Sequence, residues 1–501
     1  MEKTYCIDPR SETPFHNVAA FCVGTGRIGL ALSEEYLKQL ALVQKEIGFS
    51  YIRGHGLFSD DMAIYQEYTD EAGVKRAEYN FTYLDRVMDA YKRLNIRPFL
   101  ELGFMPKKMA SGSQTIFYWN GNTTPPASYE AWTELVRATL SHLIARYGAE
   151  EVRLWPIEVW NEPNLPGFWK DADMTEYFRL FKETFLAVKA VDARLAVGGP
   201  AICGVDDARW TRCFLDFCRG EGIRPDFITR HHYTSETPER DGHYAYVALE
   251  RRETCMNSVL RTREIVDADP DFSGLPIHIT EFNTSYCPNA PIHDTAYNAA
   301  YTAYILSRVG DVSESCSYWT FGDVFEELGV PFTPFHGGFG LVANGCVPKP
   351  TFWTFRFFRE LTGGACVLRD ERCVVVRMPG GEIRGVAWNA FEEDGARLRF
   401  RLPAETGSEF CVLTHTVDET HGNPLKIWHD MGENANPSEA ETEILRNAAR
   451  PHTESARASA ADGTAEWEIA LGFGAVCGFR VKPSALTPDR GYDYARVTRQ
   501  R

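Results

Sequence analysis

The 501-residue sequence has no uncharged apolar run long enough to span a bilayer, and residues 1–20 contain no apolar stretch of the signal-peptide type. We therefore expect a cytoplasmic protein with no membrane partner. Basic residues are the minority, because 53 Lys and Arg stand against 69 Asp and Glu, which gives a formal net charge of −16. An acidic surface repels a phosphate backbone, so we expect no nucleic-acid partner.

The sequence also lacks the short, paired cysteine spacings of zinc sites and disulfide frameworks. It has 13 cysteines, an odd number, and the nearest two, Cys213 and Cys218, match no zinc pattern. Reduced, mostly buried thiols are the expectation. His231 and His232 are adjacent, so on a strand they would point to opposite faces and would not easily chelate one ion together. We predict no metal site.

One motif points to a dinucleotide, but its context does not fit. Gly24-Thr-Gly-Arg-Ile-Gly29 follows a candidate strand and precedes a candidate helix, and the acidic Glu46 lies about 20 residues further on. A dinucleotide fold needs that acid at the end of its second strand, whereas Glu46 falls in the helical stretch before Ser50. We predict no cofactor.

Short β-rich segments alternate with amphipathic helical ones from about residue 20 to residue 325. The helical pattern is clear over residues 33–47, 129–147, 175–191 and 294–309. The expected strands are residues 21–25, 50–54, 96–102, 157–161, 196–200, 226–231, 277–281 and 315–320. Eight such units predict an α/β fold, a (β/α)8 TIM barrel with its chemistry at the carboxyl ends of the strands.

The pattern changes after Phe325, where prolines and glycines precede one further helical segment at residues 352–361. From Ala365 onward, alternating apolar and polar runs predict a C-terminal antiparallel β-sandwich. Residues 432–463 are rich in Ala and Glu, and we expect a surface excursion there with a helix at 438–449. The expected domains are a barrel over residues 15–345, a helical connection over 346–364 and a sandwich over 365–490, against which residues 1–14 are expected to pack.

Two carboxylates occupy the positions where a barrel carries chemistry. Glu162 comes directly after the fourth predicted strand, in Trp160-Asn-Glu-Pro-Asn164, and Glu281 ends the seventh. Both side chains would face one mouth. A pair of this kind can cleave a glycosidic bond, because one group protonates the leaving oxygen while the other meets the positive charge developing at the anomeric carbon.

The segments around these residues closely resemble glycoside hydrolase family 39, specifically its β-xylosidases. The likeness rests on Trp160-Asn-Glu-Pro-Asn164, Ile279-Thr-Glu-Phe-Asn-Thr-Ser-Tyr286 and Ser317-Tyr-Trp-Thr-Phe-Gly-Asp-Val-Phe-Glu-Glu327, and extends from Arg53-Gly-His-Gly56 to Phe335-His-Gly-Gly-Phe-Gly340. It implies a retaining double-displacement mechanism in which Glu162 is the acid/base and Glu281 the nucleophile. It also implies that Arg53 and Tyr233 hold the nucleophile.

The resemblance implies further contacts to the substrate. Asn161 offers its amide to the sugar 2-hydroxyl, and Trp319 supplies an apolar face. We expect Phe117, Phe168 and Tyr286, which lie on aromatic-rich loops, to form the rim of the pocket and the aglycone subsite. The remaining residues that would line the subsite of the cleaved sugar are His55, His231 and Glu327.

The leading interpretation is an exo-acting retaining β-D-xylosidase that releases xylose from the non-reducing end of xylo-oligosaccharides. One alternative is another glycosidase of the same family, above all α-L-iduronidase, whose anionic substrate would demand a cationic clamp. Arg53 and Arg230 are the nearest cations in the sequence pattern. A remote alternative is a non-catalytic carbohydrate-binding protein. Similar enzymes are often tetramers, so we expect a homo-oligomer.

Overall fold

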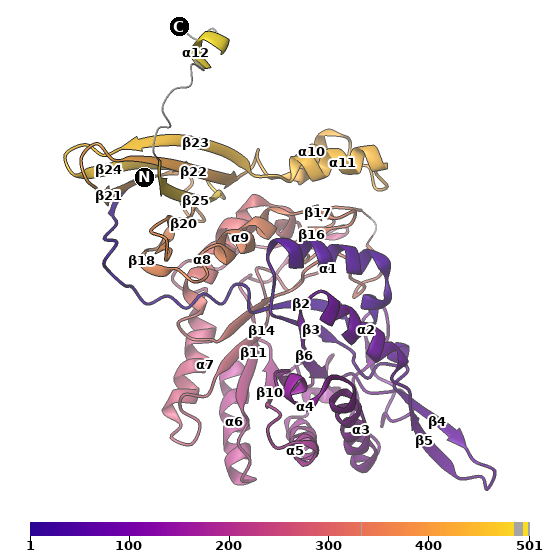
Figure 1. The fold of residues 1–501 in the computed structure, drawn as a ribbon. Coiled ribbons are helices and arrows are strands. Elements are labelled where there is room, and N and C mark those ends of the chain that lie inside the picture. Colours follow the sequence, from indigo (N-terminus) through magenta and orange to yellow (C-terminus); the bar gives the residue numbers. More distant parts are fainter. Residues whose placement is uncertain (332, 485–493, 499–501) are drawn as a thin grey trace.

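The computed structural model describes residues 1–331, 333–484 and 494–498. It comprises a barrel surrounded by helices and a separate pair of sheets packed beside one end of it (Figure 1). No helix in these described ranges is long and apolar enough to cross a membrane. All 13 cysteines have free thiols.

Eight parallel strands close into a barrel in the order β10-β11-β14-β15-β2-β3-β6-β9. They are β2 (Cys22–Arg27), β3 (Tyr51–His55), β6 (Arg97–Leu102), β9 (Ile157–Val159), β10 (Val197–Ile202), β11 (Phe227–Tyr233), β14 (Ile277–Asn283) and β15 (Ser315–Tyr318). Each predicted strand corresponds to one of these, so the barrel prediction is confirmed. The predicted strand 157–161 is too long, because Trp160 and Glu162 adopt positive φ angles of 71° and 43° and turn the chain out of the sheet.

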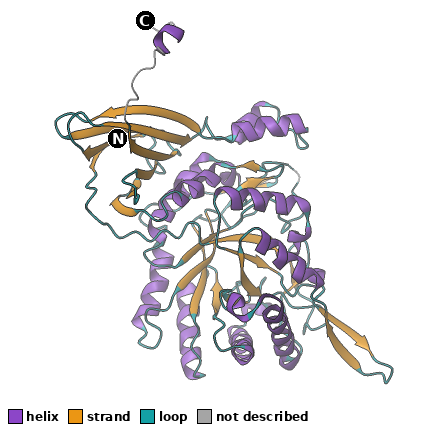
Figure 2. Ribbon diagram, viewed as in Figure 1, coloured by secondary structure: helices purple, strands orange, loops and turns teal. Residues whose placement is uncertain are grey.

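A helix follows every barrel strand and covers the outer face (Figure 2). These helices are α1 (Glu34–Glu46), α2 (Thr82–Arg93), α3 (Tyr129–Tyr147), α5 (Met174–Val191), α6 (Asp207–Gly220), α7 (Asn257–Ala268), α8 (Ala296–Val309) and α9 (Pro350–Arg359), with the short α4 (Ala149–Val152) after α3. In α2, Leu84, Val87, Met88 and Tyr91 are buried at spacings of three and four residues, which is the stripe that a helix buries on a barrel. Ser33 caps the first turn of α1 by accepting a hydrogen bond from the Tyr36 amide.

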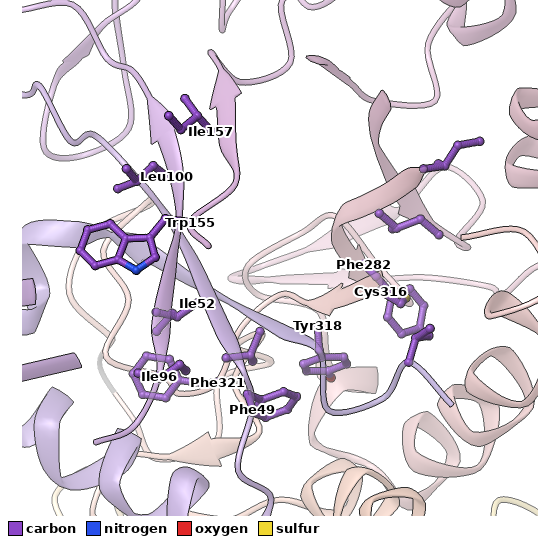
Figure 3. Packing of buried hydrophobic residues seen from close by; sticks show 14 of the residues in the cluster. Phe49, Ile52, Ile96, Leu100, Trp155, Ile157, Phe282, Cys316, Tyr318 and Phe321 are labelled. Carbon is purple, nitrogen blue, oxygen red and sulfur yellow. The ribbon is translucent and has the colours of Figure 1, made fainter. Parts of the chain in front are cut away.

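Apolar side chains from strands and helices form one core between the barrel and its helical layer (Figure 3). Ile52, Leu100 and Ile157 extend from neighbouring strands into this layer, and Tyr318 contacts Phe355 of α9 with ring centroids 5.2 Å apart. The strands are therefore buried on both faces, which leaves polar chemistry only at their ends and along the barrel axis.

The C-terminal part is a β-sandwich, as predicted. One sheet has six strands, β18 (Ala365–Arg369), β19 (Cys373–Arg377), β20 (Ile383–Trp388), β25 (Val476–Pro483), β22 (Glu409–Val417) and β23 (His452–Ser459). The other has three, β1 (Glu2–Cys6), β21 (Ala396–Pro403) and β24 (Thr464–Leu471), and β1 pairs with β21 in parallel. Side chains of β21 alternate between buried and exposed, so Leu398 and Phe400 fill the space between the sheets.

The expectation of a surface excursion at residues 432–463 is wrong in part. The helix α11 (Glu439–Ala448) forms as predicted, but with α10 (Pro424–Asp430) it packs on the small sheet of β16 (Val342–Ala343) and β17 (Val347–Pro348), which lies between β15 and α9 in the sequence. Strand β23 then pairs with β22 along its whole length. Seven of the eight β23 side chains are exposed, so no alternation of apolar residues marked it in the sequence.

The remaining elements are short. The hairpin of β4 (Tyr65–Thr69) and β5 (Lys75–Tyr79), which the sequence patterns did not predict, projects from the barrel (Figure 1). Other pairs are β7 (Thr115–Ile116) with β8 (Gly121–Asn122) and β12 (Glu239–Asp241) with β13 (Tyr244–Tyr246), and the last described helix is α12 (Tyr494–Thr498). Single 3-10 turns occur at η1 (Ile28–Leu32), η2 (Asp60–Met62), η3 (Lys170–Ala172) and η4 (Pro291–Asp294).

Candidate active site

Glu162 and Glu281 meet inside the mouth of the barrel. Glu162 lies three residues beyond the end of β9, and Glu281 lies within β14, two residues before that strand ends. One oxygen of each carboxyl group and one ring nitrogen of His231 all lie within 4.8 Å of one another. The two carboxyl groups therefore come from strands three apart in the ring and converge on one point inside the barrel mouth.

Two hydrogen-bond donors and two imidazole rings surround the carboxylate of Glu281. Arg53 Nη1 lies 2.5 Å from Oε1, and the Tyr233 hydroxyl donates to Oε2 over 2.7 Å. His55 Nε2 and His231 Nδ1 are more distant, at 3.5 and 3.4 Å. Arg53 and Tyr233 thus contact Glu281, the carboxylate that the family resemblance assigned to them.

Glu162 has the opposite environment. Its only ring partner is His231, whose Nδ1 lies 2.7 Å from Oε1. Burial and the neighbouring negative charge of Glu281 raise the pKa of Glu162 well above its usual value, although Arg53 opposes this. Burial lowers the pKa of His231, so its imidazole stays neutral and adds no charge that would favour ionised Glu162. The carboxyl group with the raised pKa therefore lies beside a carboxylate that a guanidinium and a hydroxyl hold in place.

Two further carboxylates lie beneath the pair, and sequence reasoning missed both. Arg53 Nε contacts Glu158 Oε2 at 2.7 Å, and Nη2 contacts Glu101 Oε2 at 2.9 Å. Glu101 also lies 2.7 Å from His55 Nδ1, and Glu158 accepts from the Thr280 hydroxyl over 2.8 Å. One buried guanidinium therefore joins three acidic side chains, and their charges raise its pKa although burial opposes them. The sequence offered one signal, a charged residue inside each apolar strand.

Asn161 presents one free donor. Its Oδ1 accepts from Arg53 Nη2 over 2.8 Å, which fixes the orientation of the amide. Its Nδ2 is buried and has no hydrogen-bond partner among the described residues. A buried donor without a partner is costly, so an oriented amide of this kind is suited to a ligand oxygen.

Trp319 closes the side of the site formed by β15 and β3. Its ring lies 4.7 Å from the ring of His55, and Arg53 lies 5.8 Å from its face. The glycine motif in β2 serves this packing, because a Cβ atom at Gly24 would lie 2.4 Å from Trp319 Cε3. A Cβ atom at Gly26 would lie 2.9 Å from the ring of Phe325. The motif thus admits aromatic rings to the barrel mouth.

A cavity of about 510 Å³ opens over the two carboxylates, and every residue predicted to contact substrate lines it. Phe117 and Phe168 meet edge to face at 5.3 Å on one side of it. Tyr286 is half exposed on the other side. The other predicted lining residues are His55, Asn161, His231, Tyr233, Trp319 and Glu327, while Arg53 lies behind Glu281. A neighbouring cavity of about 640 Å³, lined by Asp60 and Trp119, contains neither carboxylate.

Glu327 is a third acid in the cavity. Burial and the charges of Glu281 and Glu162 raise its pKa well above the usual value, so it enters the cavity as a donor as well as an acceptor. Nine further residues line the cavity, and none of them was predicted from the sequence to contact substrate: Leu165, Cys203, Gly204, Val205, Arg230, Ser235, Glu250, Ser258 and Phe339.

Of the groups in the described ranges, Glu162, His231 and Glu281 have the mutual distances that a metal ion would need. The contacts around them serve other partners, because Arg53 and Tyr233 already occupy both oxygens of Glu281. A guanidinium 2.5 Å from a ligand oxygen would repel a cation at that point.

Comparison with known proteins places this geometry among glycoside-cleaving enzymes. The model of glycosyl hydrolases family 39 matches residues 6–466. A β-xylosidase from Geobacillus stearothermophilus is 50% identical over 458 residues, which is 90% of each chain. A β-xylosidase from Caldicellulosiruptor saccharolyticus is 36% identical over 430 residues, 82% of this chain and 84% of that protein. The crystal structure of a monomeric β-xylosidase from Caulobacter crescentus CB15 superposes with a TM-score of 0.88 at 31% identity, over 96% of this chain and 100% of that one.

Proposed function

The chain belongs to glycosyl hydrolase family 39, and from that premise we propose that it is an exo-acting retaining β-D-xylosidase that releases xylose from the non-reducing end of xylo-oligosaccharides. The family resemblance found in the motifs is confirmed, and the chain is a glycoside hydrolase. The observation that carries the proposal is the approach of the two carboxylates to within 4.8 Å. Retaining enzymes hold such groups about 5–5.5 Å apart, and inverting enzymes about 6.5–9.5 Å apart.

The first half-reaction uses the two protonation states. Glu281 attacks the anomeric carbon while Glu162 gives its proton to the glycosidic oxygen, so the bond to the leaving sugar breaks as the glycosyl–enzyme ester forms. Asn161 Nδ2, which is buried and has no partner among the described residues, donates to the 2-hydroxyl of the sugar, and this hydrogen bond strengthens as the oxocarbenium ion develops. Trp319 packs on the apolar face of the sugar.

The second half-reaction reverses the role of Glu162. Esterification removes the negative charge of Glu281, which is one of the causes that raise the pKa of Glu162. The pKa of Glu162 then falls, and its carboxylate takes a proton from the water that attacks the anomeric carbon, while the ester bond to Glu281 breaks and its carboxylate is regenerated. Xylose leaves with its configuration retained.

An α-L-iduronidase would need a cationic side chain that binds the carboxylate of its substrate. Arg230 is the only cationic side chain among the residues described as lining the cavity, and its Nη1 is already held by Asp207 at 3.0 Å and the Ser258 carbonyl at 2.6 Å. Arg53 is held by acidic partners. The acidic surroundings favour a neutral sugar.

The test compares hydrolysis of p-nitrophenyl β-D-xyloside with that of an α-L-iduronide, with NMR of the first product formed. We expect turnover of the xyloside and the β-anomer of xylose as the initial product. Faster turnover of the iduronide, or α-xylose as the initial product, would contradict the proposal. The expected cytoplasmic location and homo-oligomer stay predictions, to be checked by cell fractionation and by light scattering.

A further inference from the structure

The closed order of the strands divides the cavity into two halves. Glu162 follows β9 and Glu281 lies on β14, so β10 and β11 lie between them on one side, and β15, β2, β3 and β6 on the other. Trp319 follows β15 and His55 ends β3, so these two contacts proposed for the cleaved sugar belong to the second half. In the first half, His231 and Tyr233 of β11 already serve Glu162 and Glu281. The cavity residues that follow the ends of β10 and β11, from Cys203 and from Ser235 onward, have no role in the mechanism above.

This unassigned half is adjacent to the proposed acid. The Glu162 amide donates to the Ala201 carbonyl of β10 over 2.9 Å, and the Asn164 side chain bonds both the amide and the carbonyl of Cys203 at 3.1 Å. Cys203 and Val205 therefore continue the wall of the cavity directly from the carboxyl group that protonates the leaving oxygen.

The far wall of this half is polar and carries one carboxylate. Glu250 lines the cavity, and its backbone is anchored on both sides, because its amide donates to the Thr234 carbonyl at 2.7 Å and its carbonyl accepts from the Tyr301 hydroxyl at 2.9 Å. Ser235 lies beside it, and its hydroxyl has no hydrogen-bond partner among the described residues. A carboxylate on an anchored backbone, next to a hydroxyl without a partner, suits a ligand with several hydroxyl donors.

Charge narrows the class of that ligand. Arg230 is the one Lys or Arg side chain among the described residues that line the cavity, and it is paired with Asp207 at 3.0 Å and almost wholly buried. Glu250 is therefore the dominant charge of this half, and it would repel an acidic substituent and attract hydroxyl donors. A neutral sugar satisfies these conditions, and a uronic acid does not.

We propose that the half of the cavity lined by Cys203, Val205, Ser235 and Glu250 is the subsite for the leaving group, and that Glu250 selects a neutral sugar there by accepting hydrogen bonds from its hydroxyls. This inference rests on the proposed function. The sugar held by Glu250 is the one whose oxygen receives the proton of Glu162, so the contact positions the leaving group for the first half-reaction.

The experiment compares kcat/KM for xylobiose with kcat/KM for p-nitrophenyl β-D-xyloside, whose leaving group has no hydroxyl to donate. In Glu250→Gln the ratio of the two constants should fall about ten- to a hundredfold, the range for hydrogen bonds to a charged group. Glu253→Gln is the matched control, because Glu253 is exposed on the same segment and does not line the cavity. This substitution removes the same charge outside the cavity. Its ratio should equal that of the wild type.

A second measurement follows the reverse use of the subsite. Xylose added as an acceptor must occupy the same half to intercept the glycosyl–enzyme, so Glu250→Gln should also lower the ratio of transfer product to hydrolysis product. An equal loss on both substrates in a variant that keeps its wild-type Tm would overturn the subsite and leave the proposed function standing. Failure of the wild type to cleave either xyloside would overturn both.

Discussion

The assignment of roles to the two carboxylates predicts an asymmetric response to azide. In Glu162→Ala the general acid/base is lost while Glu281 keeps its contacts to Arg53 and Tyr233 at 2.5 and 2.7 Å. The nucleophile can therefore still attack a substrate such as p-nitrophenyl β-D-xyloside, whose leaving group departs as a stable anion. Attack of water on the glycosyl–enzyme becomes slow, because nothing takes its proton.

The magnitude follows from the missing base. General acid–base catalysis contributes about 10²–10⁴-fold, so kcat of Glu162→Ala should fall by that factor, equivalent to about 2.7–5.5 kcal/mol of transition-state stabilisation. Because formation of the ester is less affected, stopped-flow traces should show a burst of p-nitrophenolate followed by a slow steady state. The space left by the side chain lies against His231 Nδ1, 2.7 Å from the lost oxygen in the wild type.

A small anion can enter that space and attack without a base. Azide should therefore restore a large part of kcat in Glu162→Ala and yield β-xylosyl azide, identified by NMR. In Glu281→Ala no covalent intermediate forms, so azide should not restore turnover with retained configuration. Rescue of Glu281→Ala with a retained product, and none of Glu162→Ala, would show that the roles are reversed.

Four further outcomes are expected. The kcat/KM of the wild type should fall as pH rises through the raised pKa of Glu162, because only the protonated acid can give its proton to the leaving oxygen. In Glu281→Gln the neighbouring negative charge is gone, so an NMR titration should show a lower pKa of Glu162 than in the wild type. An unchanged pKa would refute the electrostatic coupling of the two groups. Arg53→Met should lower the free energy of unfolding by about 3–5 kcal/mol, seen as a lower Tm, because it leaves three buried carboxylates without their cationic partner. A Tm equal to that of the wild type would mean that those carboxylates take up protons instead. Gly24→Ala should reduce kcat/KM with little loss of secondary structure by circular dichroism, because its Cβ would lie 2.4 Å from Trp319 Cε3; full activity would show that this ring can shift freely. Dialysis against EDTA should leave kcat unchanged, and loss of activity that a divalent ion restores would reveal a metal at the carboxylate–histidine cluster.

The barrel was predictable because each strand was marked twice, by an apolar run and by the amphipathic helix after it. The boundaries were less certain where the backbone departs from strand geometry, as at Trp160, whose φ of 71° ends β9 before Asn161. Strand β23 and the β4–β5 hairpin were missed because most of their side chains are exposed on both faces, so no burial pattern marks them. Such strands are held by backbone pairing, which composition does not record.

In the site, too, some residues could be predicted from the sequence and others could not. Glu162 and Glu281 were found because they stand where an apolar run ends, which is where a barrel presents side chains to solvent. Glu101 and Glu158 lie within strands and contact the buried Arg53 inside the barrel. A single charged residue in a predicted strand does not by itself indicate a functional site. Their importance comes from Arg53, which touches both, and that contact joins segments about 50 and 100 residues apart.

Strand β1 precedes the barrel in the sequence, yet it pairs with β21, which follows the barrel. The ribosome releases the first strand long before its partner, so this strand must wait through synthesis of the entire barrel before it can dock. Removing the first six residues would bare an edge of β21, where Leu398 and Phe400 pack beneath Tyr5, and an uncovered edge of this kind is prone to join another chain. A tag or truncation that disturbs β1 should thus destabilise the β-sandwich, which lies away from the active site.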